Sequence, residues 1–342
     1  MAPMTPMTWS RPYAGVPANM PEPGDCPSGM LQAPYFPVHL TLPDLRPWLP
    51  GNTGTRGVWQ FAAAVAGPHV AVIGLMHGNE IAGAVALDQL LTSLQSGGAC
   101  PARGTLTLIF ANLDAAARFD PKNPTSSRFV DEDLNRLWDD SEFSQQRVSA
   151  ELERARALRT VIASADVVLD LHSMLWPSDP LILCGPTAKG RALACAIGVP
   201  SLVIADSGHA SGRRLIDYAP FVDPDDPRTA ILVEAGPHWE PETVRTMLDA
   251  VAGVLDVTGL GPRREVAPNP IVAEVTVGIT AATAQFSFVA PFRGGEIVPR
   301  RDTLIAMDGG VEIRTPHDDC LLVMPSLRPG RGHTAVRLAK FV

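Results

Sequence analysis

Four polar residues that follow apolar runs could together perform hydrolytic chemistry. His77 and Glu80 come directly after HVAVIGLM, whereas His172 ends DVVLDLH and Glu234 lies in AILVEAG. Two imidazoles and one carboxylate are the ligand set of a catalytic zinc ion whose fourth position stays open for water. Zinc lowers the pKa of such a water to about 7, and a further carboxylate must then carry protons. We therefore predict that the first three residues bind zinc and that Glu234 is the general base.

Each of these residues also has a simpler interpretation. His77 could begin a helix, and Glu80 could be a charge that favours the helix dipole. His172 could be a hydrogen-bonding histidine, and Glu234 could be a salt-bridge partner. Their joint position at three strand ends favours the metal site, because ligands of parallel sheets bind beyond the carboxyl ends of the strands.

The segments around these residues alternate between apolar runs and amphipathic stretches. Apolar strands separated by helices predict an α/β fold with a mostly parallel or mixed sheet flanked by helices. The predicted strands are VWQFAAAV, HVAVIGLM, TLTLIFANL, DVVLDLH, LILCG, SLVIAD and AILVEAG. The predicted helices are GNEIAGAVALDQLLTSL, SQQRVSAELERARALRTVIASA, AKGRALACAIG and PETVRTMLDAVAGVL.

The residue composition and pattern change at two places along the chain, and this predicts three segments. Residues 1–55 are rich in proline and predict an irregular lead-in. Residues 56–262 carry the alternating pattern and predict the α/β catalytic domain. Residues 263–342 consist of short β-like runs with glycine and proline between them, which predicts a smaller β-rich domain that caps the site.

Composition limits the classes of partner. The formal net charge is −8 and no basic run offsets it, which excludes a nucleic acid or an anionic membrane as partner. The longest apolar stretch is interrupted and too short to span a bilayer. Five scattered cysteines without a CxxC motif predict reduced thiols in a cytoplasmic protein. The oligomeric state stays open, with a homodimer as one option.

Four motifs of the chain resemble the succinylglutamate desuccinylase and aspartoacylase family, a branch of the zinc carboxypeptidase-like hydrolases. They are HGNE, SRFVDEDLNRLW, DLHS and VEAGP, and they occur in family order over about residues 70–240. The resemblance implies a zinc carboxypeptidase-like fold with one Zn²⁺ per chain. It assigns the zinc to His77, Glu80 and His172 and the general base to Glu234.

The block RFVDEDLNR is the most specific part of this resemblance. It implies that Arg128 polarises the scissile carbonyl and that Asn135 and Arg136 bind a carboxylate of the substrate. The chemistry is suitable, because a guanidinium matches a carboxylate with two hydrogen bonds and can share the charge of an oxyanion. A surface loop in which Arg128 and Arg136 pair with neighbouring aspartates is the alternative. We expect Asp133 to orient Arg136.

Two departures from the family concern the substrate's side chain. Aspartoacylases place a further arginine shortly before the base, but here only Arg228 lies in the ten positions before Glu234. They also use a tyrosine of the C-terminal domain, and residues 263–342 contain none. Arg213 or Arg214 is a candidate substitute. A dicarboxylic substrate such as N-acetylaspartate is therefore disfavoured.

The sequence thus predicts a zinc-dependent amidohydrolase that cleaves a small N-acyl amino acid or a related amide bearing a carboxylate. One alternative is a metallocarboxypeptidase that trims peptides with the same metal site. A second is an inactive metal-binding regulatory protein. Glu234 speaks against the second, because a protein that only binds metal has no need of a proton carrier.

Overall fold

A long mixed β-sheet positions the chemistry-bearing residues. A computed structural model describes residues 35–98, 101–208, 212–264 and 270–342, and residues 37–342 form one compact unit. The strands are β1 (Val58–Ala62), β2 (His69–Gly74), β3 (Thr105–Phe110), β4 (Val167–Met174), β5 (Leu181–Leu183), β6 (Leu202–Ala205), β7 (Thr229–Pro237), β8 (Ile271–Thr280), β9 (Phe286–Phe288), β10 (Ile297–Val298), β11 (Leu304–Asp308), β12 (Val311–Arg314), β13 (Cys320–Val323) and β14 (Thr334–Phe341).

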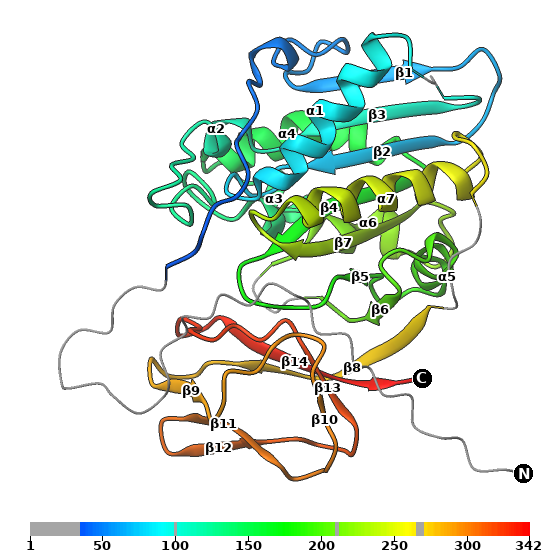
Figure 1. Ribbon diagram of the computed structural model, residues 1–342. Coiled ribbons are helices and arrows are strands. Elements are labelled where there is room, and N and C mark those ends of the chain that lie inside the picture. The colour runs from blue at the N-terminus through cyan, green and yellow to red at the C-terminus, as the bar shows by residue number, and fades with distance from the viewer. Residues whose placement is uncertain (1–34, 99–100, 209–211, 265–269) are drawn as a thin grey trace, which may run out of the picture. The chain divides into compact units, whose positions relative to one another are not determined.

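The described strands form two sheets. The main sheet has 11 strands in the order β1-β3-β2-β4-β7-β5-β6-β8-β14-β13-β10, and the smaller one is the antiparallel sheet β12-β11-β9 (Figure 1). The central strands β3, β2, β4 and β7 are all parallel. Strand β8 pairs in parallel with β6, so the main sheet continues into the C-terminal β region.

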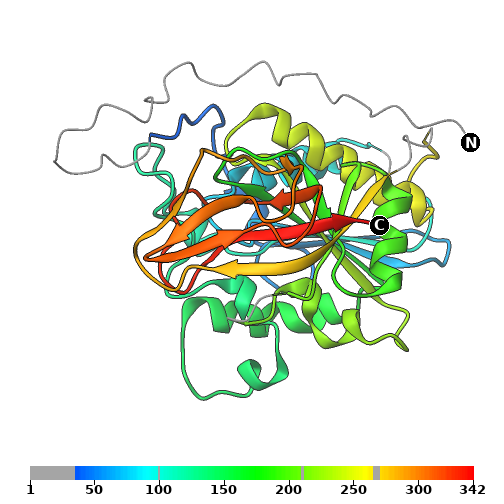
Figure 2. The same ribbon diagram turned by 90° about the horizontal axis from the view of Figure 1, so that it is seen from below.

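Helices cover both faces of the main sheet. The helices are α1 (Ile81–Gln95), α2 (Leu113–Ala116), α3 (Asp140–Phe143), α4 (Ala150–Ala163), α5 (Ala188–Ile197), α6 (Ala219–Val222) and α7 (Pro241–Val257), and the 3-10 turns are η1 (Arg46–Trp48), η2 (Leu134–Arg136) and η3 (Leu215–Asp217). Helices α1 and α7 pack on one face and α4 on the other (Figures 1 and 2).

The two cores follow from the alternation of side chains along each strand. In β2, Val70 and Val72 join the core under α1 and α7, whereas Ala71 and Ile73 join the core under α4. A strand buried on both faces must be apolar at every position, which is why these runs lack a polar side. The predicted α/β class, with a mixed sheet flanked by helices and β structure at its C-terminal end, is confirmed.

Some predicted boundaries need comment. The helix predicted from residue 144 begins only at Ala150, because the hydroxyl of Ser149 accepts a hydrogen bond from the Leu152 N–H (3.0 Å) and caps it there. Residues 1–34 of the predicted lead-in lie outside the described residues, and residues 37–55 contain only the turn η1. The domain boundaries at 55/56 and 262/263 stay predictions. Within the described residues, no helix has both the length and the apolar character needed to cross a bilayer.

Candidate metal centre

The order of the central strands brings the predicted ligands together. Strands β2, β4 and β7 are adjacent and parallel, so their carboxyl ends meet at one edge. His77 follows the end of β2, and His172 of β4 lies directly opposite Glu234 of β7 in the strand register. Leu75, just before this edge, has φ 59°, a left-handed conformation that costs such a residue about 1–2 kcal/mol. Backbone strain of this kind clusters at functional sites.

The turn between β2 and α1 is held by its neighbours. A Cβ atom at Gly78 would lie 2.4 Å from the carbonyl carbon of Ala115, so only glycine permits this close approach. The Gly78 N–H donates to the carbonyl of Arg128 (3.0 Å), and the indole N–H of Trp239 donates to the carbonyl of Asn79 (3.0 Å). Glu80 occupies the position before the first residue of α1, so His77 and Glu80 lie on the turn and not in the helix.

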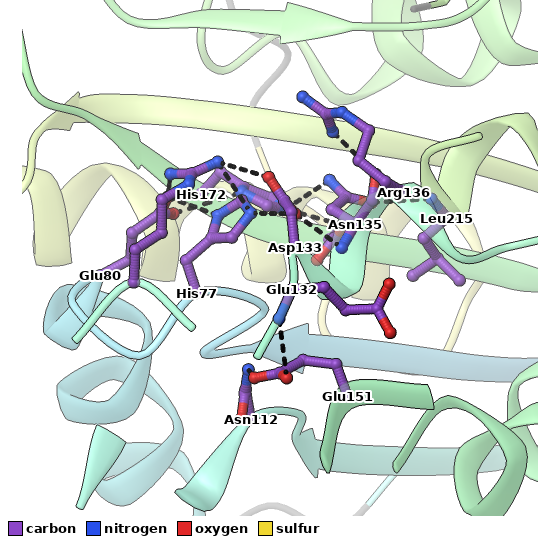
Figure 3. Close-up of polar contacts among 12 residues, drawn as sticks. His77, Glu80, Asn112, Glu132, Asp133, Asn135, Arg136, Glu151, His172 and Leu215 are labelled. Carbon is purple, nitrogen blue, oxygen red and sulfur yellow. Dashed lines mark hydrogen bonds and ion pairs between the residues drawn. The ribbon is translucent and has the colours of Figure 1, made fainter. Parts of the chain in front are cut away.

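The side chains of His77, Glu80 and His172 converge on one point. Glu80 Oε1 lies 2.7 Å from His77 Nδ1, and Glu80 Oε2 lies 3.2 Å from His172 Nδ1. One ligand atom from each residue lies within 4.8 Å of the other two, and all three side chains are buried. The two imidazole rings meet edge to face with their centroids 5.1 Å apart, and Figure 3 shows His77, Glu80 and His172 next to one another. This group could hold a metal ion.

The far nitrogen of each imidazole meets a carboxylate. His77 Nε2 lies 2.9 Å from Asp133 Oδ1, and His172 Nε2 lies 2.9 Å from Asp170 Oδ2. The backbone N–H of Ser173 donates to Glu80 Oε2 (3.0 Å). Such carboxylate partners fix the tautomer of metal-binding histidines and leave the near nitrogen free to bind. Both Nδ1 atoms are therefore oriented as ligand atoms.

The electrostatics of the centre favour a cation. Burial alone would raise the pKa of Glu80, but His77 and His172 hold it well below its usual range. Burial would likewise raise the pKa of Asp133, yet the nearby His77 lowers it. Burial would lower the pKa of His172, but Asp170 and Glu80 raise it well above 6.5. Asp170 Oδ1 is also buried without a hydrogen-bond partner among the described residues. This donor set suits a divalent ion such as zinc.

Glu234 is the buried carboxyl next to this group. Its side chain is nearly inaccessible, and Oε2 has no hydrogen-bond partner within the described part of the chain. Burial raises the pKa of Glu234 to about 8, against the opposing charges of His172 and Arg128. A carboxyl group with a pKa near neutrality can both accept and return a proton, as a general base requires.

The loop that contains RFVDEDLNR places Arg128 at the centre. Its Nη2 lies 2.9 Å from His77 Nε2 and donates to Asp133 Oδ2 (3.1 Å), and its Nη1 lies 3.5 Å from Glu80 Oε1. The side chain of Arg128 is 37% exposed, so one part of the guanidinium faces the solvent side of the centre.

Asn135 and Arg136 lie on the 3-10 turn η2 beside the ligands. Asn135 is buried, accepts the Leu215 N–H through Oδ1 (2.8 Å), and has Nδ2 3.5 Å from His172 Nε2. Arg136 Nη1 donates to the carbonyl of Asn135 (2.7 Å). The hydrogen bonds of Asp133 go to His77, Arg128 and the backbone of η2, so Asp133 affects Arg136 through its charge and not as the contact partner that we expected.

The two further candidate arginines are already paired with carboxylates. Arg214 is buried and binds Asp206 and Asp217, each through two short contacts of 2.7–3.0 Å. Arg213 is half exposed and pairs with Asp139 (2.8 Å). The guanidinium of Arg214 therefore stabilises the protein interior and is not available to a substrate carboxylate.

Sequence reasoning missed His238, which lies four residues after Glu234 in the same motif. Its Nδ1 lies 2.8 Å from the hydroxyl of Ser173, whose backbone N–H binds Glu80. Burial lowers the pKa of His238 to about 4. A neutral histidine in this position fixes Ser173 behind Glu80, which is one of the predicted ligands. The only sequence signal was its place in VEAGPH, directly beyond a candidate catalytic residue.

Comparisons with known proteins agree with this geometry. Residues 66–219 match the family model described as the succinylglutamate desuccinylase/aspartoacylase catalytic domain. No curated protein matches the chain. The matched range includes the three predicted ligands and the RFVDEDLNR loop but ends before Glu234.

Solved structures show the same fold over most of the chain. A succinylglutamate desuccinylase from Vibrio cholerae aligns with a TM-score of 0.66 at 18% identity, covering 84% of this chain and 86% of that chain. A succinylglutamate desuccinylase from Vibrio parahaemolyticus gives 0.63 at 17% identity, covering 84% and 86%. A succinylglutamate desuccinylase/aspartoacylase from Rhodobacter sphaeroides gives 0.59 at 18% identity, covering 81% and 87%. At these identities the likeness establishes the fold.

Proposed function

We propose that the chain is a metal-dependent deacylase of the succinylglutamate desuccinylase/aspartoacylase family, because residues 66–219 match the model of that family's catalytic domain. Its substrate would be a small N-acyl amino acid or a related amide that carries a carboxylate. The observation that supports the proposal best is the buried group of His77, Glu80 and His172, beside which Oε2 of Glu234 has no hydrogen-bond partner among the described residues.

The residues that would hold the metal are those three ligands, and zinc is the ion we propose, one per chain. Two imidazole nitrogens and a carboxylate oxygen leave one position of a tetrahedral ion open. When bound, zinc would supply a Lewis acid and acidify a water molecule at the open position. Asp133 and Asp170 would keep both imidazoles in the tautomer that binds.

The chain's own residues would then divide the work of amide hydrolysis. Glu234 would accept the proton of the attacking water and later deliver it to the leaving nitrogen, a double role that its raised pKa supports. Arg128 would share the negative charge that develops on the carbonyl oxygen, which is commonly the largest contribution to acyl-transfer catalysis. Asn135 and Arg136 would bind the substrate's carboxylate from the adjacent turn η2.

We further propose that the substrate's side chain is not acidic. A second carboxylate on the substrate would need a second cation without a carboxylate partner. Arg213 pairs with Asp139, and Arg214 is neutralised by Asp206 and Asp217. Neither arginine therefore offers the charge that a dicarboxylic substrate requires.

The C-terminal β region is proposed to cap the site and to exclude long peptides. Arg337 of β14 is buried, lies 3.5 Å from Asp206, and its charge acts on the pKa of Glu234. This strand thus reaches the surroundings of the general base. A capped site favours small acylated amino acids over peptides.

One experiment separates the proposal from its rivals. The zinc-loaded protein is incubated with N-acyl amino acids grouped by side-chain charge and with short peptides, and the release of free amine is measured. We expect cleavage of N-acyl amino acids with neutral side chains. Cleavage of peptides alone would establish a carboxypeptidase instead. Equal activity of the parent and a Glu234→Ala variant on every compound would indicate a metal-binding protein without this chemistry.

A further inference from the structure

We propose that Glu151 is a positioning residue, which holds the loop carrying Arg128 and Asp133 against the metal centre. Glu151 lies in the first turn of α4, far in sequence from every predicted ligand, and its side chain is fully buried. A buried carboxylate is costly unless it is fully hydrogen bonded. Its partners therefore indicate what the residue does.

Both oxygens of the Glu151 carboxylate are satisfied by the loop and by one asparagine. Oε1 accepts the Val130 N–H (2.7 Å) and the amide of Asn112 (2.9 Å). Oε2 accepts the N–H groups of Asp131 (3.0 Å) and Glu132 (3.2 Å). Three consecutive backbone N–H groups thus converge on one anion, an arrangement that fixes the backbone of the loop. Figure 3 shows Asn112 and Glu132 beside Glu151.

The segment held in this way lies between two residues of the centre. Arg128 precedes the three N–H groups by two positions, and Asp133 follows them directly. Asp133 binds His77 Nε2 and also caps η2, the turn that carries Asn135 and Arg136. Fixing residues 130–132 therefore also fixes the positions of four polar side chains relative to the predicted ligands, namely those of Arg128, Asp133, Asn135 and Arg136.

Helix α4, which carries Glu151, is itself fixed to the main sheet and to the loop. The guanidinium of Arg154, one turn along α4, donates to the carbonyls of Ala111 (2.6 Å) and Phe110 (2.7 Å) at the end of β3. In return, the side chain of Asp131 accepts the Ala150 N–H (2.7 Å) at the start of α4. The helix, the sheet and the loop are thereby joined through the buried Glu151, the partly buried Arg154 and the exposed Asp131.

A simpler role for Glu151 is a charge that favours the N-terminus of its own helix, as acidic residues in a first turn often do. The contacts argue against that role, because both carboxylate oxygens meet N–H groups of the loop and of Asn112. The first turn of α4 is instead capped by Ser149 and Asp131. Glu153, in the same turn, is exposed and pairs with Arg156, so it serves as a matched control.

The test compares Glu151→Gln with Glu153→Gln and begins with the metal-free protein. The glutamine amide directs two N–H donors at the N–H groups of the loop, so amide hydrogen exchange at residues 130–132 should rise about 10- to 100-fold. Zinc affinity should fall about 10- to 100-fold, because Asp133 no longer orients His77. Glu153→Gln should change neither quantity.

Activity gives a second readout, and this part rests on the proposed function. Glu151→Gln should lower kcat/KM about 100-fold, since a small displacement of catalytic groups is costly. An Arg128→Lys substitution should then cost much less in the Glu151→Gln background than in the parent, because the arginine is already misplaced. Equal costs in both backgrounds would overturn the proposal.

The outcomes distinguish failure of the proposed deacylase function from failure of the positioning role of Glu151. If the parent cleaves no acylated amino acid, the proposed function fails, while exchange and zinc affinity still decide the role of Glu151. Unchanged exchange at residues 130–132 in Glu151→Gln would overturn the positioning role. If Glu151→Gln does not fold, Asn112→Ala decides, because it deletes one donor and keeps the carboxylate. It should raise exchange at residues 130–132 about tenfold, and no increase would overturn the proposal.

Discussion

Replacement of Glu234 by glutamine should lower kcat at least about 100-fold and, at alkaline pH, stabilise the metal-free protein. The glutamine keeps the shape of the side chain but neither accepts nor returns a proton. General acid–base catalysis contributes about 10²- to 10⁴-fold, so kcat should fall by that factor, which corresponds to about 3–5 kcal/mol of activation free energy. Zinc content should stay at the parent level, because Glu234 is not among the predicted ligands.

The effect on stability follows from the raised pKa. Burial moves the pKa of Glu234 from 4.5 to about 8 in the folded protein. The folded state therefore holds its proton over a range where the unfolded state has lost it, so stability falls as pH rises from 4.5 through about 8. At about 1.36 kcal/mol per pH unit, the full cost is up to about 5 kcal/mol. Glutamine, which does not titrate, avoids this cost.

The assay is urea unfolding of both proteins in the presence of a chelator, at about pH 5 and about pH 8.5. Other titrating groups are common to both, so the difference in free energy of unfolding isolates Glu234. This difference should be small at the lower pH and should favour the variant by several kcal/mol at the higher pH. Glu242→Gln, a change at a half-buried residue of α7, is the control. A difference independent of pH, or a variant with more than about a tenth of the parent kcat, would refute the reasoning.

Three further predictions test other parts of the site. Removal of metal by a chelator should abolish activity and lower the midpoint temperature of unfolding, and added zinc should restore both. A His172→Ala variant mixed with one equivalent of zinc should bind none, as elemental analysis would show. Arg136→Lys should raise KM at least about tenfold and change kcat less, because lysine cannot make a bidentate contact with a carboxylate. In the same steady-state assay, Arg213→Lys should leave KM and kcat near the parent values. Asp206→Asn removes one of the two carboxylates that neutralise the buried charge of Arg214, so the free energy of unfolding should fall by about 3–5 kcal/mol in urea titrations. A loss below about 1 kcal/mol would contradict the structural role of this pair.

The amino-acid sequence by itself determined the elements and the types of chemistry. Apolar runs such as HVAVIG are continuous because strands buried on both faces admit no polar side, and this is a local property of the chain. The same holds for the strand ends, where His77, His172 and Glu234 break the apolar pattern. Parallel strands separated by helices then require these residues to meet at one edge, so their proximity followed from fold class alone.

The tertiary structure decided which partner each side chain has. The carboxylate of Asp133 contacts the imidazole of His77, whereas it acts on the guanidinium of Arg136 only through its charge. Arg214 is neutralised by Asp206 from the end of β6. Glu151 reads in the sequence as one acidic residue among several on an amphipathic helix. Contacts between segments depend on packing distances and strand register, and these come from the simultaneous burial of the whole core, which no local pattern of residues encodes.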